Sequence, residues 1–213
     1  MLFVTNLFMG IAFLASLTIY FTGNTYSYLR LFPLFLLITG IAVVIGVFLA
    51  HHDKSNTVLY NLLITFEFCY YIYILFLMVQ NKAAKAIIRY VSPGFAVLAA
   101  FNMAFLQKTG FNSMTYALGA LLVVVIGVYY LFELFQQSQP VNVARLPAFW
   151  ICAGLIFFYA CAFPLFGLAN FMRSAPQVII KNLRFIINLL NVFLYSSFTI
   201  AFLCRIRVRN STS

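Results

Sequence analysis

Acidic residues are nearly absent from this sequence. Its carboxylate side chains are those of Asp53, Glu67 and Glu133, and charged residues of both signs make up 8% of 213 positions. About a quarter of the residues in a soluble domain are charged. Hydrophobic residues reach 65% here, and the mean hydropathy is +1.03. A soluble fold of this size would expose large apolar patches, so the composition predicts an integral membrane protein.

Histidine is scarce as well, and the known catalytic motifs are absent. The two histidines, His51 and His52, are adjacent, and the four cysteines have no CxxC spacing. A metal or haem centre would need more ligands, placed on matching helix faces. Nucleophile-elbow, zinc-protease and phosphate-loop motifs do not occur. We therefore expect no catalytic residue, no metal and no cofactor, and an enzyme is the less favoured class.

Basic residues are the main charged component. The 13 lysines and arginines give a net charge of +10, but they stand singly between apolar runs and form no basic face of the kind that binds nucleic acid. This pattern is typical of membrane anchoring by anionic headgroups. The expected partners are membrane lipids and not nucleic acid. The sequence is also compatible with a homo-oligomer.

Seven apolar segments have the length that a membrane helix needs, roughly 20 residues. They predict an all-α, seven-transmembrane helix bundle that forms a single transmembrane domain over residues 1–213. The expected spans are Leu2 to Phe21, Leu31 to Ala50, Thr57 to Val79, Ile87 to Leu106, Met114 to Phe135, Ala148 to Asn170, and Ile179 to Cys204.

The distribution of lysine and arginine between the connectors predicts the orientation. Seven spans place eight basic residues on one side: Arg30, Lys82, Lys85, Arg89, Arg145, Arg205, Arg207 and Arg209. Five lie on the other side: Lys54, Lys108, Arg173, Lys181 and Arg184. This bias predicts an outside N-terminus and a cytoplasmic C-terminus.

Glu67 is the one acidic residue near the middle of an expected span. Placing a carboxylate in the membrane is costly, about 3 kcal/mol on insertion scales, so it should face the bundle interior. There it would respond to a ligand, an ion or a proton, or it would hold helices together as a structural carboxyl. Tyr71 lies on the same helix face, four residues further on.

Polar residues recur at intervals of three or four along the last span and predict one polar face. They are Lys181, Arg184, Asn188, Asn191 and Tyr195. If this face meets Glu67 and Tyr71, the seven residues would form a ligand-binding cavity open to the outside. The alternative is that Lys181 and Arg184 extend to the headgroups.

The segment from Leu146 to Tyr159, with its Pro-x-Phe-Trp start, resembles uncharacterised bacterial multi-span proteins when taken with Asn188, Asn191 and Tyr195. It also resembles the membrane input regions of bacterial sensor histidine kinases. The resemblance covers the last third of the chain. It implies a sensory or signalling module in the bacterial inner membrane. Because this sequence lacks a kinase domain, signalling would need a cytoplasmic partner such as a separately encoded histidine kinase.

The leading expectation is thus a receptor-like module that responds to a small ligand or a membrane state. The alternatives are a small transporter or channel, marked by a polar path to both faces, and a membrane-embedded enzyme. Most of the expected buried polarity lies in one half of the membrane, which favours the sensor.

Overall fold

The computed structural model describes the chain except residues 1, 22–25, 108–109, 137–141, 168–176 and 211–213, and describes only the backbone at 2, 167, 177–179 and 205–210. Within this part the regular structure is helical. The seven α-helices are α1 Leu2–Phe21, α2 Phe32–His51, α3 Thr57–Met78, α4 Lys82–Phe101, α5 Ser113–Phe135, α6 Pro147–Gly167 and α7 Gln177–Asn210. Three short elements join them: η1 Ser27–Leu29, the π-helix η2 Asn102–Leu106, and η3 Val143–Arg145.

The predicted seven-helix architecture is confirmed for the described residues. Seven helices are long and apolar enough to cross a membrane, as in a multi-pass membrane protein. Large apolar side chains cover the outside of the molecule, and Phe3, Phe21 and Tyr90 are each more than three-quarters exposed. Hydrocarbon is the solvent that such a surface requires.

Two helices extend beyond the predicted spans. α4 begins at Lys82 and not at Ile87, because Asn81 caps it by accepting hydrogen bonds from the backbone N–H groups of Ala83 and Ala84. α7 continues past the expected end at Cys204 to Asn210. The predicted end of the sixth span at Asn170 lies outside the described residues, as do Lys108 and Arg173.

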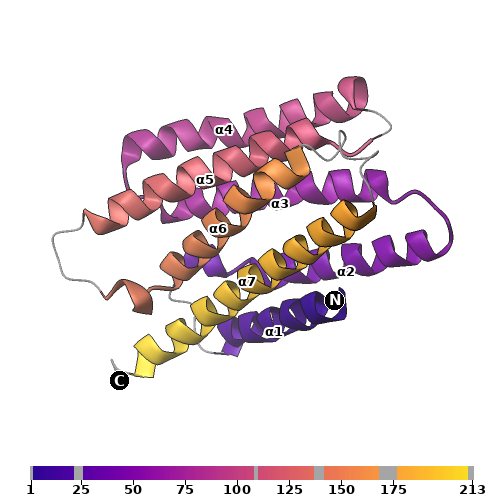
Figure 1. Ribbon diagram of the computed structural model, residues 1–213. Coiled ribbons are helices and arrows are strands. Elements are labelled where there is room, and N and C mark those ends of the chain that lie inside the picture. The colour runs from indigo at the N-terminus through magenta and orange to yellow at the C-terminus, as the bar shows by residue number, and fades with distance from the viewer. Residues whose placement is uncertain (1, 22–25, 108–109, 137–141, 168–176, 211–213) are drawn as a thin grey trace.

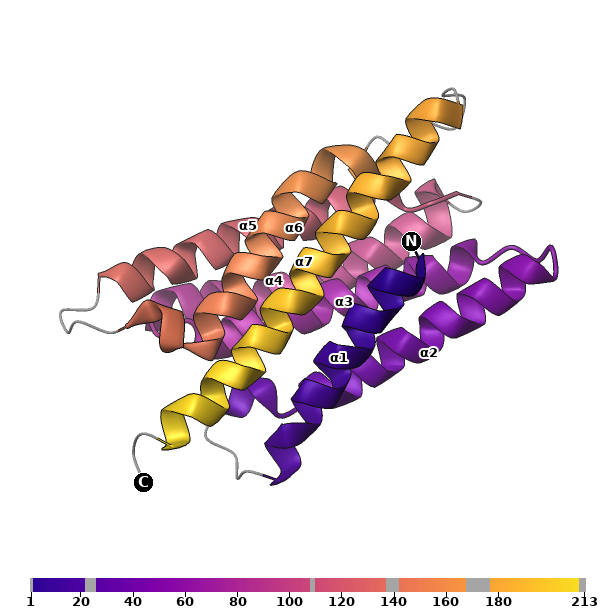
Figure 2. The ribbon, with the colours of Figure 1, turned by 60° about the horizontal axis from the view of Figure 1, so that its bottom comes forward.

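Six of the helices form a closed ring of neighbours. α1 packs on α2, α2 on α3, α3 on α5, α5 on α6, α6 on α7, and α7 returns to α1 (Figures 1 and 2). α4 stands outside the ring, mainly against α3, and lies at the upper edge of Figure 1. We call the end with residues 52–56 and 110–112 the His52 end, and the end with 26–31, 79–81 and 142–146 the Gln80 end.

Glycines allow close approach between ring helices. A Cβ atom at Gly119 of α5 would overlap the ring of Phe68 from α3. A Cβ atom at Gly154 of α6 would stand 2.8 Å from the Cβ of Ser197 on α7. Small residues at helix contacts are the usual means of packing membrane helices closely.

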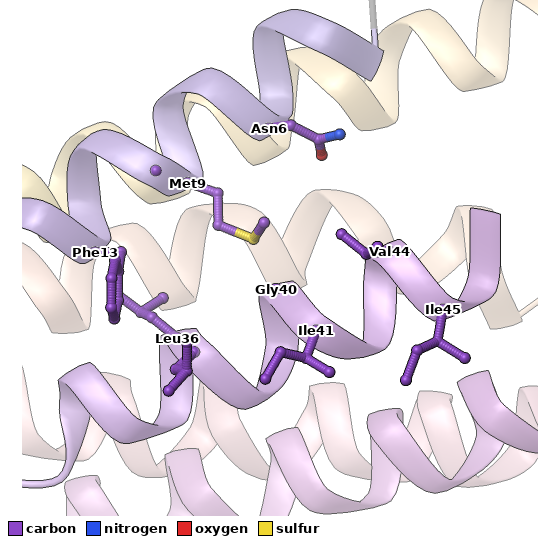
Figure 3. Close-up of a pocket in the computed structure, with 10 residues that line it drawn as sticks. Asn6, Met9, Phe13, Leu36, Gly40, Ile41, Val44 and Ile45 are labelled. Carbon is purple, nitrogen blue, oxygen red and sulfur yellow. The ribbon is translucent and has the colours of Figure 1, made fainter. Parts of the chain in front are cut away.

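The shallow space between α1 and α2 is an apolar groove of about 370 Å³ (Figure 3). Met9 and Phe13 of α1 and Ile41 and Val44 of α2 form much of its wall, and Asn6 is its polar side chain. Walls of this kind suit a lipid hydrocarbon chain. The groove offers few groups that would orient a polar ligand.

Candidate functional site

Glu67 lies at the middle of α3 and is partly buried. Among the described residues, no hydrogen bond or ion pair reaches its carboxylate. Buried polar groups in folded proteins almost always have a partner, and an ionised carboxylate in a membrane interior needs one most. The position therefore points to a group that the protein alone does not supply.

Four tyrosines from four helices lie near this carboxylate. Tyr71 of α3, Tyr116 of α5, Tyr159 of α6 and Tyr195 of α7 are buried, and each lies within electrostatic range of Glu67. The ring centroids of Tyr71 and Tyr159 are 5.8 Å apart, and those of Tyr116 and Tyr159 are 6.2 Å apart. We call these five residues the Glu67–tyrosine cluster. It combines one carboxyl group with aromatic faces and phenol groups.

The hydroxyl of Tyr116 is a further group without a partner. It is buried, and no described residue hydrogen-bonds with it. The aromatic rings of Phe68 and Phe166 flank the Tyr116 ring, at centroid distances of 5.4 Å and 4.6 Å. A phenol held in place by packing, with its O–H group unused, is available to a ligand or to water.

A second set of polar side chains lies between the cluster and the His52 end. We call it the amide cluster, and it consists of Asn61, Asn102, Gln107, Asn112, Ser113 and Thr115. Asn61 of α3 holds the connector before α5: its amide donates to the carbonyl of Gly110 at 3.0 Å, and its Oδ1 accepts from the N–H of Asn112 at 3.0 Å.

The rest of the amide cluster joins the π-helix η2 to α5. The amide nitrogen of Asn102 donates to Gln107 at 2.9 Å and to the hydroxyl of Thr115 at 2.8 Å. The side-chain amide of Gln107 donates in turn to Ser113 at 3.1 Å. π-helical turns are often found near functional sites.

Buried polar atoms without a partner among the described residues occur in the amide cluster as well as in the Glu67–tyrosine cluster. The side chain of Asn112 is 1% exposed, and neither its nitrogen nor its oxygen has a partner among the described residues. Asn112 directly precedes α5, and its backbone carbonyl accepts a hydrogen bond from the N–H of Tyr116 at 2.9 Å. Polar, partnerless positions of this kind are where buried water or a polar ligand is found.

Toward the Gln80 end the interior becomes aromatic and aliphatic. Phe32 of α2 packs against Phe198 and Phe202 of α7, with ring centroids 4.9 Å and 5.3 Å apart. Phe35 stacks on Tyr70 at 4.0 Å. We call Phe32, Phe35, Phe198 and Phe202 the aromatic plug; all four are at most 2% exposed.

The structure brings part of the predicted site together. Tyr71 and Tyr195 lie within electrostatic range of Glu67. Lys181 and Arg184 are exposed instead, and no ion pair joins either of them to Glu67. They stand near the end of α7, where long basic side chains reach water more readily than the bundle interior.

The two asparagines of the predicted stripe are partly buried and make other contacts. The Oδ1 atom of Asn188 accepts a hydrogen bond from the hydroxyl of Thr5 on α1 at 3.3 Å. The amide of Asn191 donates to the carbonyl of Ile187 in its own helix at 2.9 Å. Asn188 thus joins α7 to α1, away from the cluster.

Sequence reasoning missed Tyr116 and Tyr159 as site residues. Each is one of the 13 tyrosines of the chain, and no spacing rule links residues of α5 and α6 to Glu67. Asn61 and Asn112 carried a clearer signal, since asparagine inside or beside a membrane span tends to bind another helix or a ligand.

No group of three or more His, Cys, Asp or Glu residues that could hold a metal occurs in the described part of the chain. Comparison with known proteins gives no further assignment: no protein-family model, no curated protein and no solved structure matches this chain.

Proposed function

We propose that this protein is a membrane sensory module that binds a small organic cation at the Glu67–tyrosine cluster. The observation that carries the proposal is a mid-membrane carboxyl group that forms no ion pair with any described residue and has four buried tyrosines nearby. A positive charge would neutralise Glu67, and aromatic ring faces attract the same charge through cation–π interactions.

The route to this site runs from the His52 end. Asn112 in the connector before α5 and Tyr116 in the cluster both carry buried side-chain atoms that have no partner among the described residues. The expected orientation places the His52 end outside, so the ligand would arrive from the external medium. Glu67, Tyr71 and Tyr195 remain the proposed ligand-binding residues from the sequence, joined by Tyr116 and Tyr159.

The aromatic plug favours a sensor over the alternative, a transporter or channel. Conduction needs a polar path to both faces, and Phe32, Phe198 and Phe202 fill the interior below the cluster with fully buried rings. A ligand that enters from one side and cannot leave at the other can still shift the packing of the helices.

Helix α6 offers a direct way to transmit such a shift. Tyr159 contributes to the cluster, and Trp150 lies on the same helix, about 13 Å nearer the Gln80 end. The indole N–H of Trp150 donates to the carbonyl of Ala144 at 2.9 Å. A small movement of α6 would therefore reach the connector that contains η3.

The partner in this proposal is a cytoplasmic signalling protein such as a histidine kinase, in a bacterial inner membrane. The contact surface for this partner would include residues 82–89, which form the first two turns of α4. The surface would then consist of the exposed start of α4, η3 and the last turns of α7. Part of the connector 136–147 lies outside the described residues.

The test uses the full chain in nanodiscs, with tetramethylammonium and ethylammonium as probes and the fluorescence of Trp150, the one tryptophan, as readout. A saturable change is expected for at least one probe. In Glu67→Gln the apparent Kd should rise about ten- to a hundredfold, the usual cost of losing a charged partner.

Asp53→Asn is the matched control because Asp53 is an exposed acid in the connector at the His52 end. Equal probe binding by Glu67→Gln and the unchanged protein would reject the site. Cation flux into liposomes that depends on the protein would reject the sensor in favour of a transporter.

A further inference from the structure

A separate cavity of about 430 Å³ lies at the Gln80 end. It is formed where α3 ends, α4 begins, α5 ends and α6 begins, and residues 26–28 cover one side of it. Its polar lining includes Lys85 and three tyrosines, Tyr26, Tyr28 and Tyr130, while Leu77 and Leu134 contribute apolar wall. It shares no residue with the Glu67–tyrosine cluster or the amide cluster.

Lys85 is held in position by contact with α3. Its ammonium nitrogen lies 5.7 Å from the ring centroid of Phe76, and the guanidinium of Arg89 approaches the same ring at 6.0 Å. No acidic side chain in the described part of the chain forms an ion pair with Lys85. The ammonium group therefore lies at the cavity wall with its charge uncompensated.

The nearest carboxylate is already engaged. Glu133 of α5 accepts hydrogen bonds from the backbone N–H groups of Gln80 at 2.8 Å and Asn81 at 2.6 Å, one with each oxygen. These two bonds direct both carboxylate oxygens toward the start of α4. Glu133 lowers the positive potential of the cavity without neutralising Lys85.

Other cations reinforce the positive charge of this end. Four further basic residues lie within a few sequence positions of the cavity lining: Arg30, Lys82, Arg89 and Arg145. The acidic residue at this end, among those that the structure describes, is Glu133. Basic pockets between membrane helices at headgroup level are suited to phosphate groups of lipids.

We propose that this cavity binds the phosphate group of an anionic phospholipid. Lys85 pairs with the phosphate oxygens, and the tyrosine hydroxyls supply further hydrogen-bond donors around it. Leu77 and Leu134 contact the start of the acyl chains, which a soluble phosphate compound would lack. The mixed wall therefore fits a lipid better than a free anion.

Native mass spectrometry of the full chain in detergent tests this site, with dihexanoyl phosphatidylglycerol, dihexanoyl phosphatidylcholine and inorganic phosphate as probes. We expect phosphatidylglycerol to stay bound at concentrations where the other two do not. Lys85→Gln should weaken its binding about tenfold or more, the effect of losing one charge-assisted contact.

Arg89→Gln is the matched control because it removes an equal charge from the same Phe76 ring but does not line the cavity. Equal loss in both variants would overturn the specific site in favour of a diffuse basic surface. Equal binding of the two lipids would overturn the preference for an anionic headgroup. If inorganic phosphate competes at the same concentrations as the lipid, the ligand is a free phosphate and not a phospholipid.

A third variant keeps the test decisive if Lys85→Gln does not fold. Tyr130→Phe removes one hydroxyl from the lining and preserves the buried ring. It should weaken phosphatidylglycerol binding while leaving the thermal stability of the protein nearly unchanged. Unaltered lipid binding by both Tyr130→Phe and a Tyr26→Phe variant would reject the cavity as the lipid site.

Discussion

The ring of Phe68 on α3 occupies the space that a side chain at Gly119 on α5 would need. The same ring packs against Tyr116 and Tyr159 of the Glu67–tyrosine cluster, at 5.4 Å and 5.0 Å between centroids. The glycine therefore sets how closely α3 and α5 approach and, through Phe68, where two of the tyrosines lie.

Replacing Gly119 with alanine should destabilise the protein. The added methyl group overlaps Phe68, and overpacking of this kind costs about 1–3 kcal/mol. The measurement is the thermal midpoint in detergent. Gly10→Ala is the control, since a Cβ atom at Gly10 meets nothing within 4 Å. If both variants have the same thermal midpoint, Phe68 has room to move and its contact with Gly119 does not limit the packing of α3 on α5.

Replacing Glu133 with alanine should loosen the start of α4. The backbone N–H groups of Gln80 and Asn81 lose their acceptor, and hydrogen bonds to a charged group contribute about 1.5–3 kcal/mol each. Hydrogen exchange of residues 80–85 should accelerate while α1 is unaffected. Asp53→Asn serves as comparison, and unchanged protection in Glu133→Ala would contradict the capping role.

Replacing Asn61 with leucine should destabilise the connector before α5. The N–H of Asn112 and the carbonyl of Gly110 would lose their partner, at a cost of about 1–3 kcal/mol for each buried group. Limited proteolysis near residues 107–112 and the thermal midpoint both report the change. Asn6→Leu, at an exposed asparagine, should be tolerated.

Replacing Asn112 with leucine should have the opposite outcome. Its side-chain amide is buried and has no partner among the described residues, so an apolar side chain of similar size removes a desolvation penalty and breaks no hydrogen bond with them. The thermal midpoint should stay level or rise. A drop as large as that of Asn61→Leu would show that the Asn112 amide is bound by water or ligand even in the purified protein.

The spans were predictable from the sequence because hydrocarbon imposes a length and a composition on each helix, whatever its neighbours are. The start of α4 was not predicted, because the basic residues Lys82 and Lys85 were read as a connector. The Asn81 cap that begins the helix there depends on backbone geometry that an apolar run does not reveal.

The candidate site was predictable only in part. Glu67, Tyr71 and Tyr195 could be found because a polar residue at mid-span must face inward. Arg184 follows the same spacing as Tyr195, yet it lies about 16 Å nearer the helix end, where water competes for its charge. Periodicity gives a face of a helix but not the depth at which that face becomes buried.

The ring of helices also dictates an order of assembly. α1 and α7 are direct neighbours, although α1 leaves the ribosome before the six other helices of the bundle. The buried side of α1, which includes Ala12, Ser16 and Ile19, must therefore wait in lipid or against an insertion factor during most of translation. The ring of helices around Glu67 therefore closes only after α7 has inserted into the membrane.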